Sequence, residues 1–282
     1  MDTADIHAAF AKAGLARLVK DIDTLAKPSM RLLATPVDET SIVLGASKIG
    51  GLPDLPPGIH WPELNGVPQS FIAQIRLEEV HPYDSERLLP ERGMLWFFYD
   101  ALQETYGADP QDCGGWQVIL QDISSAYLQR ATIPATLPAQ SRFKAASVRF
   151  VPEITLSQVP KLDLPAYDWS DEELEKYEDL IAELVPPDER AFRHRLLGNA
   201  DLIQDDLRLQ CHLVSHGVTD EDDPRAQKLA AGAMDWRLLL QVDTDERLGM
   251  RWSSTGMLYY CITATNLRAR RFETAWLVMQ AD

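Results

Sequence analysis

The sequence predicts an α+β protein whose mostly antiparallel β core is made of two diverged tandem repeats. Two observations support this prediction: five short motifs recur in the same order in both halves, and apolar β-type runs alternate with Gly- and Pro-rich loops. We expect an N-terminal helical segment at 1–28, a first repeat at 29–146 and a second repeat at 147–282. A helical insertion at about 168–197 interrupts the second repeat, and the whole forms one compact unit.

The N-terminal segment has a helical pattern of apolar residues over 3–26. The phase of this pattern slips at Gly14, so the segment is either two short helices or one kinked helix. Pro28 ends it, because the residue before a proline disfavours the α conformation. Strands are then expected at 30–34, 41–44, 70–77, 94–99, 116–121, 148–151, 238–242, 257–262 and 275–279.

The clearest helix belongs to the insertion. Ser170 and Glu173 have the spacing of a capping box, in which each side chain bonds the other residue's backbone. Pro186 and Pro187 stop this helix, and a shorter helix is expected over 188–197. Its apolar stripe consists of Leu174, Tyr177, Ile181 and Leu184.

The repeat rests on motifs that match in pairs. The Gly-Met-Leu identity within the fourth pair is hard to obtain twice at equivalent places by chance. The second repeat is longer between its first two motifs, and the extra residues are largely the capped helix and its successor. The pairs are 29–32 with 147–150, 51–55 with 198–202, 71–75 with 238–242, 93–97 with 256–260, and 116–119 with 276–279.

Gln74 and Gln241 occupy matching places in these motifs, each in mid-strand between apolar neighbours. A buried amide must find hydrogen-bond partners. In one interpretation each amide holds a loop backbone at the same place in each repeat. In the other, both amides line a cleft between the repeats and bind a ligand there.

Composition limits the classes of partner. Hydrophobic residues make up 45% and charged residues 25% of the 282, which are ordinary globular values. The formal net charge of −16 would repel a phosphate backbone, so no nucleic-acid partner is expected. The acidity either serves solubility or steers a basic partner protein.

Cysteine usage and the N-terminus favour a cytoplasmic protein. Cys113, Cys211 and Cys261 are widely spaced and form no CxxC pair, which suits a reducing compartment. Residues 1–5 lack the basic and apolar regions of a signal peptide. The longest strongly apolar stretch, 94–99, is too short for a membrane span, so no membrane association is expected.

Motifs for catalysis or metal binding are incomplete. His212 and His216 are spaced as on one helix face, but the Glu of a zinc protease motif is replaced by Leu213. The loop 45–51 places Lys48 before its last glycines, unlike a P-loop. The acidic run 220–223 lacks the spacing of a calcium loop. We therefore predict no catalytic residue, no metal and no cofactor.

The chain resembles the YwqG-like family of uncharacterised bacterial proteins. The resemblance lies in Ser47–Pro53 followed by Trp61-Pro62, in Phe71–Ile75, in Gly93–Asp100 and in Leu238–Asp243, and it covers most of the chain from about residue 40. It implies a shared α+β fold without an established reaction, and an association with bacterial toxin–immunity systems. Trp61 and Asp100 join Gln74 and Gln241 as ligand-cleft candidates.

The resemblance has one departure. Where the family usually has Trp-Gly-Asp-x-Gly, this chain has Trp252-Ser253-Ser254-Thr255-Gly256. Ser254 takes the acidic position, so any role of that carboxylate is absent from this position.

The insertion is strongly acidic: residues 168–189 hold ten carboxylates and the single base Lys176. This is either a solvated helix face or a docking surface for a basic protein, since a patch of one sign accelerates encounter with its complement. Trp169 could then supply an aromatic anchor. The partner-binding candidates are Trp169, Asp171, Glu172, Glu175, Glu178 and Asp179.

These observations favour a non-enzymatic binding protein, with the hypothesis that it is an immunity-type protein that neutralises a basic bacterial toxin through its acidic surface. The alternative is a small-molecule-binding protein, or an enzyme of unknown reaction, that uses the cleft between the two repeats.

Overall fold

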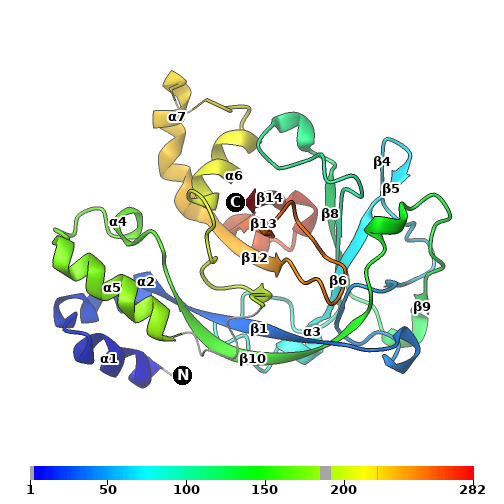
Figure 1. Cartoon of the computed structure of the whole chain (residues 1–282), viewed down its shortest axis with the longest axis horizontal. Helices are drawn as coiled ribbons and strands as arrows, with labels where there is room; N and C mark the ends of the chain where they lie inside the picture. The colour runs from blue at the N-terminus through cyan, green and yellow to red at the C-terminus, as the bar shows by residue number, and fades with distance from the viewer. Residues whose placement is uncertain (1–2, 185–191, 221) are drawn as a thin grey trace.

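The computed structural model describes residues 3–184, 192–220 and 222–282 and has an α+β fold (Figure 1). Its main sheet has ten strands, and every strand pairing described in it is antiparallel. In spatial order the strands are β14 (Trp276–Ala281), β13 (Gly256–Thr263), β12 (Trp236–Asp243), β11 (Arg195–Leu196), β1 (Ala26–Pro36), β10 (Ala146–Leu156), β2 (Lys48–Ile49), β6 (Ser70–Arg76), β7 (Met94–Tyr99) and β8 (Trp116–Gln121).

The remaining elements are short. Two small ladders join β3 (Asp54–Leu55) to β9 (Gln129–Arg130) and β4 (Glu63–Leu64) to β5 (Val67–Pro68). The α-helices are α1 (Thr3–Lys12), α2 (Ile22–Leu25), α3 (Leu77–Val80), α4 (Pro160–Asp163), α5 (Asp171–Leu184), α6 (Leu207–Ser215), α7 (Pro224–Leu229) and α8 (Ala264–Arg268). The 3₁₀ turns are η1 (Ala16–Asp21), η2 (Glu39–Ser41), η3 (Pro110–Asp112), η4 (Ser125–Tyr127), η5 (Ala139–Ser141), η6 (Ala230–Asp235) and η7 (Phe272–Thr274).

The two long strands β1 and β10 pair along their full lengths in the middle of the sheet. The strand from the first half, β1, borders β11 of the second half, whereas β10 of the second half borders β2 of the first. The first long strand of each half is therefore hydrogen-bonded to strands of the other half, and this crossed pairing joins the two halves through backbone hydrogen bonds.

The sheet curls until its edge strands β8 and β14 meet, which gives a nearly closed, barrel-like form. Trp116 on β8 and Trp276 on β14 pack with ring centroids 4.9 Å apart. The Trp116 indole donates to the carbonyl of Ala275 at 2.8 Å, and the Trp276 indole donates to that of Gly107 at 3.0 Å. Buried aromatic and aliphatic side chains from both halves fill the interior as one core.

The N-terminal helices pack against the acidic helix α5 at one end of the β1–β10 pair (Figure 1). Their small separate core includes Phe10 of α1, Leu18 of η1 and Tyr177 of α5, all fully buried. The capping box is confirmed: the Glu173 backbone N–H donates to Ser170 Oγ, and the Ser170 N–H donates to Glu173 Oε2, both at 3.2 Å. The shared core of α1, η1 and α5 therefore holds the insertion against the N-terminal helices.

Two expected elements differ in the structure. The strand predicted at 41–44 is wrong, because Asp38 accepts a hydrogen bond from the Thr40 N–H and caps the 3₁₀ turn η2 instead. Val43 and Leu44 are then exposed, so of the apolar run that suggested a strand only Ile42 is buried. The helix predicted at 188–197 falls partly on 185–191, outside the described residues, and its end forms strand β11.

Closure of the sheet depends on a close backbone approach at Gly107, which has φ of 74°; a Cβ there would lie 1.8 Å from the Leu277 carbonyl oxygen. We expect Gly107→Ala to lower the free energy of unfolding by roughly 2–4 kcal/mol in urea denaturation. Gly66→Ala is the matched control, since Gly66 has φ of 81° but open space around it; it should cost only about 1 kcal/mol of left-handed strain. Equal losses would show that the close approach is unimportant.

Candidate functional site

The amide of Gln74 on β6 is fully buried and bonded at both ends. Its Nε2 donates to Asp54 Oδ2 and to the carbonyl of Ala46, both at 2.8 Å. Its Oε1 accepts the Asp54 backbone N–H at 2.8 Å. Gln74 therefore holds the turn around Asp54 against the sheet, and both N–H groups of its amide are used within the chain.

Asp54 in turn gathers the nearby positive charge. Its carboxylate accepts from Arg130 Nε at 2.9 Å and from the Gly45 N–H at 2.8 Å, and Lys48 Nζ lies 3.4 Å away. Burial opposes ionisation of Asp54, but these donors and the Lys48 charge outweigh it and hold the pKa of the carboxyl below its usual value. Burial lowers the pKa of the Lys48 ammonium, an effect that Glu39 and Asp54 partly offset.

The second half contains a corresponding network around Gln241 on β12. Gln241 Nε2 donates to Asp201 Oδ2 at 2.9 Å and to the Arg193 carbonyl at 2.6 Å, while its Oε1 accepts the Asp201 N–H at 2.9 Å. Arg195 bridges Asp201 and Glu153, with both ion pairs at 2.7 Å. Burial again opposes ionisation, but the Arg195 charge and the Gln241 amide lower the pKa of Asp201.

The surroundings of the two networks also correspond. The Trp96 indole donates to the Asp54 carbonyl at 2.9 Å, and the Tyr259 hydroxyl donates to the Asp201 carbonyl at 2.6 Å. Strands β6 and β12 each carry a bulge two residues before the network's glutamine, at Ile72 and Leu239. In both halves, then, a mid-strand glutamine amide and one aromatic side chain hold the loop that contains the aspartate.

The other two cleft candidates lie apart from these networks. Trp61 donates its indole N–H to the Gln69 carbonyl at 2.8 Å and lines a cavity of about 390 Å³, together with Phe71 and Phe143. Asp100 is buried and caps a turn by accepting the backbone N–H groups of the second and fourth residues after it. The glutamines and Asp100 do not line the Trp61 cavity, so the structure does not gather the four candidates into one cleft.

The partner-binding candidates divide into two groups. The five carboxylates lie on the exposed side of α5, where Glu172 pairs with Lys176 at 2.5 Å; they are Asp171, Glu172, Glu175, Glu178 and Asp179. Trp169 is half-buried instead, with its ring 4.8 Å from that of Tyr167 and 5.6 Å from that of Tyr177. Its indole therefore packs beneath the acidic face and helps to hold α5 in place.

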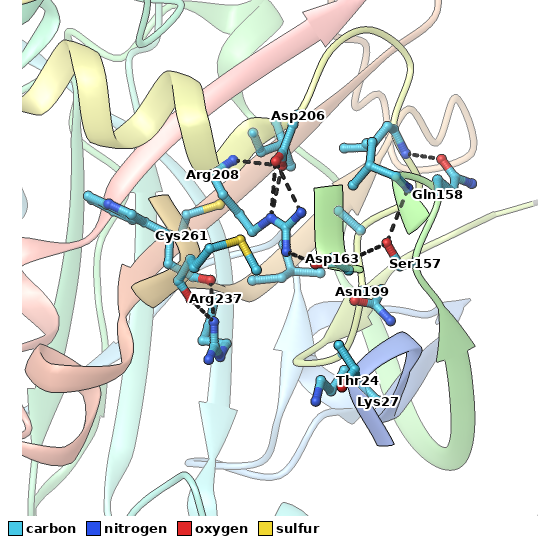
Figure 2. A pocket seen from close by; sticks show the side chains of 18 residues that line it. Thr24, Lys27, Ser157, Gln158, Asp163, Asn199, Asp206, Arg208, Arg237 and Cys261 are labelled. Atoms are coloured by element: carbon cyan, nitrogen blue, oxygen red, sulfur yellow. Dashed lines mark hydrogen bonds and ion pairs between the residues drawn. The ribbon is translucent and has the colours of Figure 1, made fainter. Parts of the chain in front are cut away.

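A pocket of about 190 Å³ that the motifs did not indicate lies where the helical group meets the sheet (Figure 2). Arg208 lies in it as a neutralised cation, 2.5 Å from Asp163 and 3.0 Å from Asp206. Lys27 and Arg237 also line it: Lys27 Nζ donates to the Asp23 carbonyl, and the Arg237 guanidinium donates to the carbonyls of Met234 and Trp236. These residues come from distant segments, so no local motif could have predicted the pocket.

Among the described residues, no group of three or more His, Cys, Asp and Glu side chains is arranged to hold a metal ion. Over the same residues, every helix is too short or too polar to cross a membrane.

The fold and these networks define an α+β protein built on one curled antiparallel sheet with a buried carboxylate–amide network in each half. A family model described as a domain of unknown function, DUF1963, matches residues 47–281, and the chain belongs to that family. None of the curated proteins compared with the chain matches it.

Replacing either network glutamine with leucine leaves a buried N–H and a carboxylate without their partner. Gln74→Leu and Gln241→Leu are each expected to lower the free energy of unfolding by roughly 2–4 kcal/mol. Gln117→Leu, at an exposed position of β8, should change it by less than about 0.5 kcal/mol. Urea denaturation monitored by tryptophan fluorescence measures all three, and a loss at Gln117 as large as the other two would contradict the role of the networks.

The networks also predict acid sensitivity. Because the folded-state pKa of Asp201 is lowered, its stabilisation is present above the unfolded pKa of about 3.9 and is lost as the pH falls through the folded value. Asp201→Asn should therefore be less stable than the parent at pH 7 but lose less stability below about pH 4. Unfolding curves across this range test it, with Asp171→Asn on the exposed helix as control; an unchanged acid limb in Asp201→Asn would refute it.

Proposed function

We propose that the protein is a non-enzymatic binding protein that receives a basic partner protein on the exposed face of α5. The observation that carries the proposal is the charge around this face: residues 168–184 hold eight carboxylates, seven of them exposed, against the single base Lys176. An immunity-type role, in which the partner is a basic toxin, is the form of this function that the sequence suggests.

The way in which α5 is held supports this proposal. Arg17 pairs with Glu173 at 3.0 Å, and the Tyr167 hydroxyl donates to the same carboxylate at 2.8 Å. Tyr177 and Leu180 are buried on the opposite side of the helix. The exposed carboxylates therefore project from a helix whose position is set by packing, which lowers the ordering cost of binding and lets their field steer a basic protein.

We also infer that the sheet derives from two copies of one module that exchange their first long strands. The matching contacts of Gln74 and Gln241, the matching bulges of β6 and β12, and the crossed pairing of β1 and β10 support this inference. The α5 insertion has no counterpart in the first copy. A surface added to only one copy is a natural place for a function that the shared fold does not supply.

Charge reversal on α5 tests the function. Affinity capture from the producing cell compares the parent with a charge-reversed variant that carries Asp171→Lys, Glu175→Lys, Glu178→Lys and Asp179→Lys. The captured basic protein is then purified. We expect this basic protein to associate with the parent at least about tenfold faster than with the variant. The difference should shrink between about 50 mM and about 300 mM salt, because salt screens exposed charges.

The matched control reverses four exposed glutamates elsewhere on the described surface: Glu63, Glu91, Glu104 and Glu273. It changes the net charge by the same amount without touching α5. If both quadruple variants slow association equally, the effect belongs to net charge and the docking site on α5 is wrong. If the α5 variant associates at the parent rate, the proposed function itself is wrong.

A further inference from the structure

The pocket in Figure 2 continues into a second cavity of about 400 Å³. The two share four lining residues, Lys27, Gly198, Arg237 and Leu238. Lys27 comes from the start of β1 and Arg237 from β12, so the shared boundary has a cation on each of two strands. We call the two cavities together the basic groove.

The basic groove holds positive charge that the chain does not neutralise. Among the described residues, Lys27, Arg237 and Arg268 form no ion pair with a carboxylate. Elsewhere the buried cations are paired: Lys48 lies 2.9 Å from Glu39, and Arg195 lies 2.7 Å from Asp201. Lys27 and Arg237 are partly buried, whereas Arg268 is exposed and the exposed Glu86 also lines the second cavity. In a chain of net charge −16, the unpaired and partly buried Lys27 and Arg237 in a concave site favour an anion from outside the chain.

The remaining lining can receive an organic body and further polar groups. Trp236, Leu238 and Cys261 give it buried apolar walls. The Asn199 amide donates both N–H groups to backbone carbonyls, at 3.0 and 2.8 Å, which leaves its side-chain oxygen as an acceptor. Gln158 accepts the Leu202 N–H at 2.7 Å, which leaves its amide N–H groups as donors. A few convergent polar groups over apolar walls are typical of small-molecule sites.

We propose that the basic groove binds a small organic anion, with its carboxylate or phosphate between Lys27 and Arg237 and its apolar body against Trp236 and Leu238. Lys27 supplies a compact ammonium and Arg237 a planar fork of donors, and both suit these two anions. This site is separate from the exposed face of α5, so either proposal can fail without the other.

Binding to the full-length protein tests the site, with phenyl phosphate and benzoate as probes and benzyl alcohol as the neutral analogue. Isothermal titration up to about 10 mM should give saturable, one-to-one binding of at least one anion and none of the alcohol. The tighter anion identifies the group that the site prefers. Inorganic phosphate tests the apolar walls, since it should bind at least about tenfold more weakly than phenyl phosphate.

The double variant Lys27→Met, Arg237→Gln should weaken binding of the anion at least about tenfold. Arg251→Gln removes one positive charge from an exposed residue that lines neither cavity and should leave binding unchanged. Arg237→Lys keeps the charge and should retain part of the affinity, which guards against a folding defect in the double variant. The proposal is overturned if neither anion saturates, if the alcohol binds equally, or if the double variant binds like the parent.

Discussion

In each half of the protein one buried aspartate, Asp54 or Asp201, is bonded to a mid-strand glutamine, and the need to satisfy its carboxylate organises the sheet around it. A buried charge is tolerated when it is paired and its lone pairs are hydrogen-bonded. Asp54 meets this requirement with Arg130, Lys48 and the amide of Gln74. Each of these partners sits on a different strand or loop, so satisfying one carboxylate sets the register of β2 against β6 and the position of the turn that follows β2.

The second half meets the same requirement with an arginine. Arg195 lies opposite Gln241 in the sheet, as Lys48 lies opposite Gln74, and it forms ion pairs with both Asp201 and Glu153, a residue of β10. The network of the second half therefore extends into the central strand pair, in which β1 and β10 each border a strand of the other half. Electrostatics and strand order are coupled at this point, since an error in either would leave buried charge unpaired.

Charge is distributed unevenly over this frame, and both candidate binding features arise near the insertion. The exposed side of α5 concentrates carboxylates, whereas the basic groove below the helical group keeps Lys27 and Arg237 without carboxylate partners among the described residues. The sheet supplies rigid walls for the groove, and the small helical core holds α5 in place. One scaffold thus carries both of the proposed binding features, an acidic helix face and a groove with two unpaired cations.

Local patterns in the sequence were enough to predict most long strands, the capping box at Ser170 and the two glutamines, because apolar runs, cap spacing and a polar residue amid apolar neighbours are short-range signals. They failed at 41–44, where one Asp38 side chain caps a 3₁₀ turn. The crossed pairing of β1 and β10 and the basic groove were decided by tertiary structure alone. Partner choice between strands and convergence of side chains from distant segments are long-range events, and no residue's neighbours in the sequence encode them.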